Sequence, residues 1–269
     1  MSDPQKKNAL LTGQVAIVTG GGRGIGRSIA QALAAAGVKV AISARTRDQL
    51  DETVALINQA GGQAISFTLD VTDQPAVEQM VSETTRQYGP VDLLVNNAGI
   101  VGDEAPIWDT VATDWWHVVE VNLFGSFLYA RAVLPGMIAR QSGRIINVSS
   151  GLGTSPSSIY SSYSVSKAAL FRLTDCLAEM THKDGVSVFA ISPGLVRTAS
   201  ALDLPIYKDV PDSDWVPVER AAELCVFLAT GKADRLSGRY LHASKDITEL
   251  VQRTDEILAN DLYVLRLRE

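Results

Sequence analysis

The chain has 269 residues, a length that α/β folds reach as one domain. Hydrophobic residues make up 46% of it and charged residues 20%, which supplies enough apolar material for a large core and excludes the disordered and low-complexity classes. Its formal net charge of −6 argues against a nucleic-acid-binding surface, which would need a basic stripe.

The distribution of residues disfavours further classes. The longest apolar runs have strand length, far short of the roughly 20 residues that span a bilayer, so we expect no membrane association. Residues 1–13 contain no sustained apolar segment, and we expect a flexible tail rather than a signal peptide, and a cytoplasmic protein. The three histidines are scattered without metal-ligand spacing, so we expect no metal.

Short β-branched segments alternate with longer segments of helical periodicity, as in a parallel sheet covered on both faces. The segments expected as strands are 14–19, 38–43, 63–69, 91–96, 143–149, 186–192 and 238–243. The segments expected as helices are 24–36, 46–60, 74–88, 112–140, 163–183 and 217–230. We therefore predict a single-domain α/β fold over residues 14–244, a doubly wound (Rossmann) sheet of about seven parallel strands with helices on both faces.

Residues 194–217 interrupt this alternation. The segment has prolines, acidic residues and scattered apolar residues but no long period. A connection of this length in a compact domain is usually a functional lid or a disordered insert. We predict that it is a lid over the substrate.

A glycine-rich stretch, TGGGRGIG at residues 19–26, follows the first predicted strand and opens the first predicted helix. Strand, glycine loop and helix N-terminus form an anion site, because backbone N–H groups point at a pyrophosphate and missing side chains let it approach. No Gly-Lys-Ser/Thr follows, which disfavours a P-loop nucleotidase. The residues of this stretch that we expect to bind a dinucleotide are Gly20, Arg23, Gly24, Ile25 and Gly26.

The end of the second predicted strand indicates which dinucleotide binds. An NAD site normally has a carboxylate there, whereas an arginine suits the 2′-phosphate of NADP. Ala44 occupies the position expected for the acid, and Arg45 follows it. With Arg23 as a second guanidinium, we predict NADP(H) rather than NAD. The alternative is that both arginines are ordinary surface charges.

Tyr163 and Lys167 are four residues apart near the start of a predicted helix. At 3.6 residues per turn their side chains lie on one face, about 6 Å apart along the axis. Tyr160 has Ser164 at the same offset, so Tyr163 is the tyrosine of this cluster with a cation beside it.

Six motifs together resemble, in order and spacing, the compact NADP(H)-preferring branch of the short-chain dehydrogenase/reductase family. They are TGGGRGIG, NNAG (96–99), Asn122 in VNLFGSF, Ser150 in INVSSG, Tyr163 and Lys167 in YSVSK, and SPGLVRT (192–198). The resemblance extends from about Gln14 to about Tyr240.

By this resemblance, further residues would contact the cofactor. Asp70 and Val71 would flank the adenine ring. The residues expected along the cleft and the nicotinamide half are Asn97, Ala98, Gly99, Pro193, Gly194, Val196 and Thr198, and Lys167 would bind the nicotinamide ribose. Such enzymes act on small carbonyl or alcohol substrates and are usually homodimers or homotetramers that pair through the helices corresponding to 112–140 and 163–183.

The C-terminus, residues 245–269, departs from the family pattern. The apolar residues from Ile247 to Leu258 follow i, i+3, i+4, i+7 spacing, which predicts an added amphipathic helix. It would pack on its own subunit or cover the active site of a neighbour.

The resemblance implies reduction of a ketone, or oxidation of a secondary alcohol, by hydride transfer with Tyr163 as acid and base. A free tyrosine has a pKa of about 10, too high for ready transfer near neutral pH. A unit charge at ~4 Å in an effective dielectric of ~20 contributes roughly 4 kcal/mol, or about 3 pKa units, before desolvation opposes it. We therefore expect Lys167, with the positive nicotinamide, to lower the pKa of Tyr163.

Two more residues complete the expected catalytic set. Ser150 would hydrogen-bond the substrate oxygen, and the resemblance selects it over its neighbour Ser149. Asn122 would hold a water that relays protons to Lys167, or would instead satisfy backbone groups. The alternative functions are a 3-oxoacyl-thioester reductase of the same family and a non-catalytic NADPH-sensing scaffold.

Overall fold

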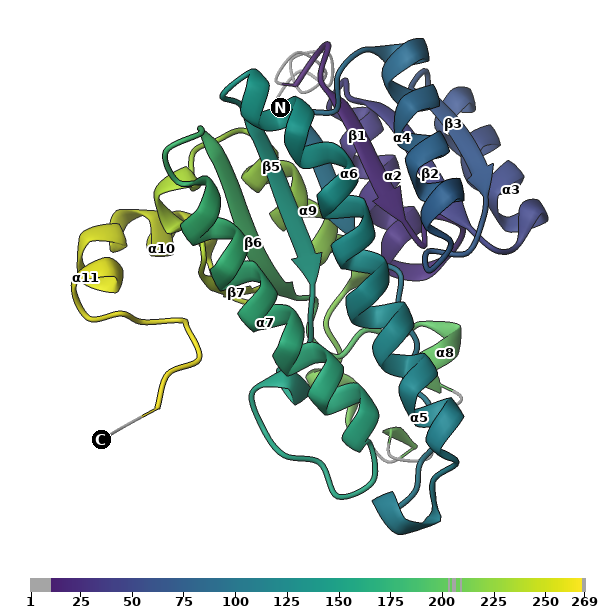
Figure 1. Cartoon of the computed structure of the whole chain (residues 1–269), viewed down its shortest axis with the longest axis vertical. Coiled ribbons are helices and arrows are strands. Elements are labelled where there is room, and N and C mark those ends of the chain that lie inside the picture. The colour runs from purple at the N-terminus through teal and green to yellow at the C-terminus, as the bar shows by residue number, and fades with distance from the viewer. Residues whose placement is uncertain (1–10, 203, 205–206, 209, 268–269) are drawn as a thin grey trace.

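The structure, a computed structural model, describes residues 11–202, 204, 207–208 and 210–267. Within these residues, seven parallel strands form one sheet in the order β3-β2-β1-β4-β5-β6-β7 (Figure 1). The strands are β1 (Val15–Thr19), β2 (Lys39–Ala44), β3 (Gln63–Thr68), β4 (Leu93–Asn96), β5 (Gly143–Val148), β6 (Val186–Ser192) and β7 (Tyr240–His242). The predicted doubly wound α/β fold is confirmed.

Helices cover both faces of the sheet and create two separate apolar cores. The main helices are α2 (Gly24–Ala35), α3 (Arg47–Gln59), α4 (Gln74–Tyr88), α5 (Ala112–Val119), α6 (Gly125–Ala139), α7 (Ser161–Thr181) and α9 (Val218–Ala229). In Figure 1, α6 and α7 lie in front of the sheet, and α2 and α9 lie behind it. Apolar residues of α4, α6 and α7 form one core, and those of α2, α3 and α9 form the other. Because both faces are covered, the central strands are apolar throughout rather than alternating.

The strand order reverses between β1 and β4, since successive strands are added on one side of β1 and then on the other. In open parallel sheets, ligands bind in the crevice outside the carboxyl ends of the strands at this switch point. The glycine loop after β1, Asn97 after β4 and Ser149 after β5 all follow strand ends at that edge. The topology thus assembles the motifs that are far apart in sequence.

A π-helical turn, Glu120–Phe124, joins α5 to α6 in one continuous helical stretch, close to the expected helix 112–140. Among the described residues, Ala112–Ala139 is the one stretch long and apolar enough to span a bilayer by length and composition, and 50% of its most apolar window is buried within the protein. Core helices of globular proteins have the same property.

The expected flexible tail, 1–13, is wrong at its C-terminal end. Leu11 is 2% exposed and belongs to the core behind the sheet, where its backbone N–H donates to Ala36 O at 3.2 Å. Burial of this leucine ties residues 11–13 to the domain. Residues 1–10 lie outside the described part of the chain.

The C-terminal extension is helical, but it forms two short helices, α10 (Ile247–Gln252) and α11 (Thr254–Ala259), instead of one. Arg253 interrupts them with a non-helical backbone (φ −93°, ψ 15°). The predicted apolar face nevertheless packs inward, because Leu250 and Ile257 join the core that contains α2 and α9. The extension therefore packs on its own subunit.

Replacing Ile257 should destabilise the whole domain. Its side chain is 0% exposed, so Ile257→Ala leaves a cavity and should lower the free energy of unfolding by about 2–5 kcal/mol. Leu258→Ala is the matched control, because Leu258 is 36% exposed and its loss should cost under about 1 kcal/mol. Urea denaturation measures both; equal effects would mean that the extension is not part of the core.

Candidate active site

A cleft of about 480 Å³ lies at the carboxyl edge of the sheet. It brings together most of the predicted cofactor residues, namely Gly20, Arg23, Gly24, Ile25, Gly26, Arg45, Asp70, Val71, Asn97, Ala98, Gly99, Tyr163, Lys167, Pro193 and Thr198. Gly194 and Val196 do not line it. Val196 is buried, and a Cβ at Gly194 would lie 2.5 Å from Val216 Cγ2, so both residues pack the loop behind the cleft.

The glycine loop requires glycine for two physical reasons. Gly20 and Gly24 have φ of +66° and +55°, in the left-handed region that side chains disfavour. A Cβ at Gly26 would collide with the carbonyl oxygen of Gly20 and lie 2.5 Å from Asn97 Nδ2. Asn97 Nδ2 donates to Thr19 O at 2.8 Å, so the NNAG motif and the glycine loop form one hydrogen-bonded unit.

The N-terminus of α2 points into the cleft. Helix α2 begins at Gly24, has no side-chain cap at Arg23 and has no acidic residue in its first turn. Gly24, Ile25 and Gly26 all line the cleft. The first N–H groups of a helix and its dipole favour an anion, so this end of the cleft suits a pyrophosphate.

The opposite wall carries the residues expected to select the cofactor. Ala44 and Arg45 line the cleft at the end of β2, so the residue at the predicted acid position carries no carboxylate. Partial burial raises the pKa of Asp70, but hydrogen bonds from the backbone and side chain of Thr72, and the charge of Arg45, outweigh it and leave this pKa below its usual value. Asp70 is thus held in its charged form near Arg45 by these interactions.

Helix α7 places Tyr163 and Lys167 together, as the spacing predicts. Lys167 Nζ lies 5.5 Å from the centroid of the Tyr163 ring. The helix begins at Ser161, two residues earlier than expected, so Tyr163 lies in its first turn. Both side chains line the cleft.

The expected lowering of the Tyr163 pKa is not found. Burial raises the pKa of Tyr163 to about 12, although a hydrogen bond with Ser150 opposes this. Burial also lowers the pKa of Lys167 to about 8. Desolvation therefore dominates both pKa shifts, because both groups lose water when the helix packs against the sheet.

Lys167 is 4% exposed, and its ammonium is held in place by the sheet. Its Nζ donates to Val148 O at 2.8 Å, the carbonyl of the last residue of β5. This hydrogen bond aims the side chain across the cleft floor toward Gly99, where a Cβ would lie 3.4 Å from Nζ.

The two serines that follow β5 have different hydrogen-bond partners. Ser149 is buried, and its Oγ donates to Lys167 O at 3.0 Å. The Ser150 side chain instead accepts from Leu152 N at 3.2 Å and hydrogen-bonds Tyr163. Ser149 lines the cleft and Ser150 does not, but Ser150 is the serine whose hydroxyl is beside the tyrosine.

Asn122 is fully buried in the π-helical turn, and its amide satisfies other groups of the protein. Its Nδ2 donates to Ile100 O and Ser166 Oγ, both at 2.9 Å, while its Oδ1 accepts from Ile100 N at 2.8 Å. Both amide hydrogens are used, so a water could bond only to Oδ1. The alternative role of Asn122, satisfying backbone groups, is present in the structure.

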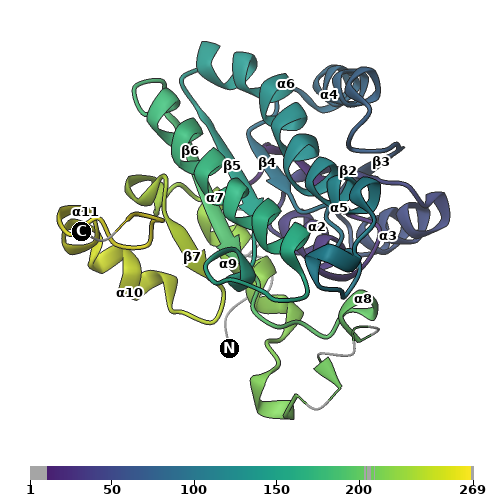
Figure 2. The same ribbon diagram turned by 60° about the horizontal axis from the view of Figure 1, so that its bottom comes forward.

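The predicted lid, 194–217, contains a short helix, α8 (Ala199–Leu202), and a 3₁₀ turn, Asp212–Asp214. Figure 2 shows this segment projecting from the end of the molecule where α5 and α7 begin. Trp215 packs edge-on against Tyr207, with ring centroids 6.0 Å apart, and stacks with Arg197 at 5.0 Å. Residues 203, 205–206 and 209 lie outside the described part of the chain.

Sequence reasoning missed several residues that line the cleft, namely Gly22, Thr46, Gln49, Leu69, Ile100, Val101, Val121, Val148 and Ala199. Most follow a predicted strand or open the next helix. Position at the carboxyl end of a parallel strand could have indicated Thr46, Leu69 and Ile100.

A doubly wound sheet with a glycine loop at its switch point and a tyrosine–lysine pair in the same cleft defines the class of dinucleotide-dependent oxidoreductases. The family model for short chain dehydrogenase matches residues 14–205. The chain belongs to this family, whose members are oxidoreductases that act on alcohol and ketone groups.

Three similar proteins illustrate the relationship. A short chain dehydrogenase of Pseudocercospora fijiensis is 35% identical, over 94% of this chain and 87% of the relative. A 3-oxoacyl-[acyl-carrier-protein] reductase of Synechocystis is 37% identical, over 83% of this chain and 92% of the relative. The crystal structure of a metagenomic short-chain oxidoreductase in complex with NADP has a TM-score of 0.72 and 32% identity, covering 82% of this chain and 92% of that chain.

The low pKa of Lys167 predicts a pH-dependent cost to stability. Because the folded pKa is about 8 and the ordinary value is 10.5, the unfolded chain holds this proton more tightly. The cost is complete below about pH 8, shrinks as the pH rises, and is gone above about pH 10.5. Thermal melts at pH 7 and pH 10 should therefore show wild type gaining stability relative to Lys167→Met. The exposed Lys183→Met should show no such change, and a pH-independent difference for Lys167→Met would contradict the shift.

Proposed function

We propose that the protein is an NADP(H)-dependent reductase of ketones, or dehydrogenase of secondary alcohols, with Tyr163 as the proton donor and acceptor. The observation that carries the proposal is that Tyr163 and Lys167 line one cleft whose other end suits a pyrophosphate, with the Ser150 hydroxyl beside Tyr163. A purely structural role does not require a buried lysine beside a half-buried tyrosine, because burying an ammonium costs free energy.

The residues of the cleft fit a dinucleotide. Gly24 and Gly26 place no side chain at the N-terminus of α2, and the lining includes Arg45 as well as Tyr163. Backbone N–H groups of residues 24–26 would bind the pyrophosphate, and Lys167 the nicotinamide ribose. When bound, NADPH supplies the hydride that reduces the carbonyl carbon.

Side chains of the protein donate and accept the proton. As the carbonyl oxygen gains the electron pair of the double bond, Ser150 hydrogen-bonds it and Tyr163 donates the phenolic proton. With a pKa of about 12, Tyr163 is protonated at neutral pH, which suits it to donate in the reductive direction. Lys167 stabilises the phenolate that remains, and in the oxidative direction Tyr163 accepts the proton from the alcohol.

The cofactor preference rests on Arg45 and Arg23. Both are exposed on the cleft lining, and Ala44 stands at the position where NAD-binding enzymes place an acid. A guanidinium can bind a 2′-phosphate with two parallel hydrogen bonds. The NADP complex of the metagenomic relative supports the same choice.

A second candidate substrate class is the 3-oxoacyl thioester, favoured by the similarity to the Synechocystis reductase. Tyr207 and Trp215 of the lid, whose rings pack edge-on, would offer apolar surface to either substrate class. A panel of ketones, diketones, quinones and acyl thioesters, followed by the loss of NADPH absorbance, separates the two. NADPH binding without turnover on the whole panel would instead favour the sensing scaffold.

We also propose that the protein is a homo-oligomer that pairs through α6 and α7. A groove of about 550 Å³ there is lined by Trp116, Leu123, Phe124, Phe127 and Leu173, among others. Phe124 and Phe127 are stacked 6.0 Å apart and partly exposed, and an apolar patch of this kind is typical of a subunit interface.

Removing the phenol should abolish catalysis but not cofactor binding. Tyr163→Phe keeps the ring and loses the acid, so kcat should fall by about 10²–10⁴-fold while the Kd for NADPH changes less than about twofold. The control is Tyr160→Phe, because the Tyr160 hydroxyl donates to Glu104 Oε2 at 2.6 Å, and this variant should keep most of its turnover. Full activity of Tyr163→Phe would show that Tyr163 is not the proton donor.

Removing the Arg45 guanidinium should weaken the binding of NADPH but not that of NADH. A hydrogen bond to a charged group contributes about 1.5–3 kcal/mol, so Arg45→Ala should raise the Kd for NADPH by about 10- to 100-fold and leave that for NADH nearly unchanged. The control is Arg47→Ala, since Arg47 pairs with Asp51 at 2.8 Å. Fluorescence titration measures both, and an equal loss for NADPH and NADH would refute the preference.

A further inference from the structure

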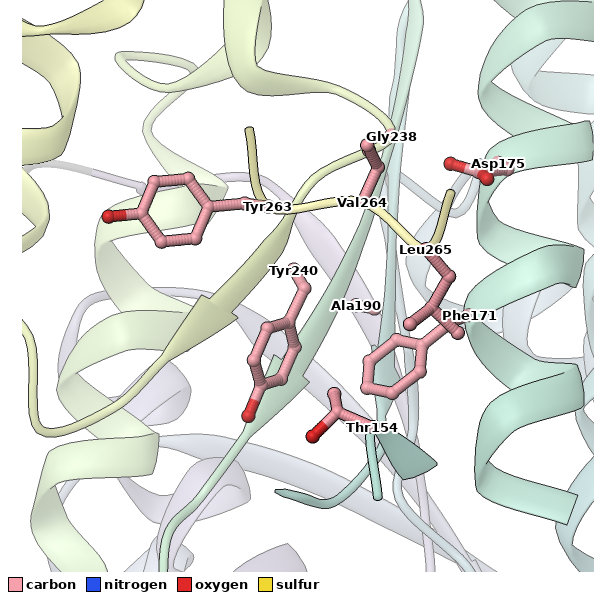
Figure 3. Close-up of a pocket in the computed structure, with 9 residues that line it drawn as sticks. All are labelled: Thr154, Phe171, Asp175, Ala190, Gly238, Tyr240, Tyr263, Val264 and Leu265. Carbon is pink, nitrogen blue, oxygen red and sulfur yellow. The ribbon is translucent and has the colours of Figure 1, made fainter. Parts of the chain in front are cut away.

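Residues 262–267, which we call the C-terminal strap, lie across the outer edge of the sheet. Tyr240 of β7 donates its backbone N–H to Tyr263 O at 2.8 Å, so the strap occupies hydrogen-bonding positions on the free side of β7. Arg172 of α7 donates to Leu265 O at 3.0 Å. The strap is therefore joined to both β7 and α7 (Figure 3).

An ion-pair network anchors the strap. Arg266 donates to Asp175 Oδ2 at 2.7 Å and to Asp261 Oδ2 at 2.9 Å. Asp175 also accepts from Arg172 at 2.9 Å, and Asp261 pairs with Arg239 at 3.1 Å. A network of this kind holds its members more firmly than an isolated surface pair does. Asp175 lies four residues after Phe171, on the same side of α7.

An apolar cavity of about 80 Å³ lies beneath the strap. Its lining includes Leu265, Phe171, Tyr240 and Thr154. In Figure 3 the Leu265 side chain points from the strap toward the ring of Phe171. The cavity leaves Phe171 incompletely packed on this side, so Leu265 and the edge-on contact with Tyr240, at 4.9 Å between centroids, limit where the ring can move.

Phe171 also supports the turn that follows Ser150. The turn, Gly151–Gly153, rests directly on α7, because a Cβ at Gly153 would lie 2.7 Å from Phe171 Cε2 and 2.8 Å from the backbone carbon of Lys167. With no space between the ring and the turn, a displacement of Phe171 moves the turn. Ser150 is the residue from which this turn starts.

We infer that the C-terminal strap positions Ser150, with Leu265 acting through Phe171 on the Gly151–Gly153 turn. The inference rests on the proposed function of Ser150 as the group that hydrogen-bonds the substrate oxygen. Leu265 and Phe171 are positioning residues, because neither lines the cleft. The strap thereby gives the added C-terminal segment a role in the reaction as well as in stability.

The first test is a kinetic comparison of Leu265→Ala with Leu258→Ala, a control in the same C-terminal extension that does not line the cavity. Because small misplacements of a catalytic group can cost up to about 10²-fold in rate, Leu265→Ala should lower kcat by about tenfold and leave the KM for NADPH within about twofold. Leu258→Ala should keep the wild-type kcat. A wild-type kcat for Leu265→Ala would overturn the inference even if its melting temperature falls.

The second test asks whether Leu265 acts through Phe171. Phe171→Leu should also lower kcat, and the double variant with Leu265→Ala should be no slower than Phe171→Leu alone, because the ring that transmits the effect is already absent. Losses that multiply in the double variant would overturn the route through Phe171. Arg266→Gln changes an exposed anchor and leaves the core intact. It should also lower kcat and leave the KM for NADPH nearly unchanged, but the fall in kcat should be smaller than in Leu265→Ala.

A third measurement separates failure of this inference from failure of the proposed function. Hydrogen exchange of residues 150–154 needs no substrate, and it should quicken in Leu265→Ala but not in Leu258→Ala. The amides of Gly153 and Thr154 report the turn directly, since they donate to Ser150 O and Gly151 O at 3.0 and 2.9 Å. Unchanged exchange would overturn the inference, whereas a wild-type protein that turns over no carbonyl compound would overturn the proposed function alone.

Discussion

The site depends on the hydrogen bond between the Lys167 ammonium and the carbonyl oxygen of Val148. It joins α7 to the end of β5 at a point where both are buried, and Ser149 Oγ, which donates to Lys167 O, reinforces the same junction. A buried donor or acceptor without a partner is costly, so these bonds determine how α7 sits on the sheet. The positions of Tyr163 and Ser150 follow from this junction.

The nucleotide half of the cleft is held together by similar close contacts. Asn97 hydrogen-bonds the backbone of Thr19, and the space beside Gly26 is filled by the Gly20 carbonyl and the Asn97 amide. The loop after β1 and the loop after β4 are thereby held at a fixed distance from each other. A preformed cleft of this kind binds a cofactor without a large cost in loop ordering.

Burial sets the chemistry of the catalytic pair. It makes Tyr163 a weaker acid and Lys167 a weaker base, so that the first is protonated and the second is only partly protonated slightly above neutral pH. The pKa values of the two groups, about 12 and about 8, lie further apart than the ordinary values of 10.0 and 10.5, so near neutral pH the proton stays on the Tyr163 phenol until a substrate oxygen accepts it.

The sequence alone determined the features that depend on local geometry. The spacing of Tyr163 and Lys167, the glycine loop before α2 and the inward face of Leu250 and Ile257 follow from helix and turn periodicities. Tertiary structure decided the rest: the pKa of Tyr163 through burial, the partners of Asn122 through Ile100, and the pairing of Tyr263 with Tyr240 across the sheet edge. Desolvation and long-range hydrogen bonds depend on which segments meet in space, and local periodicity does not contain that information.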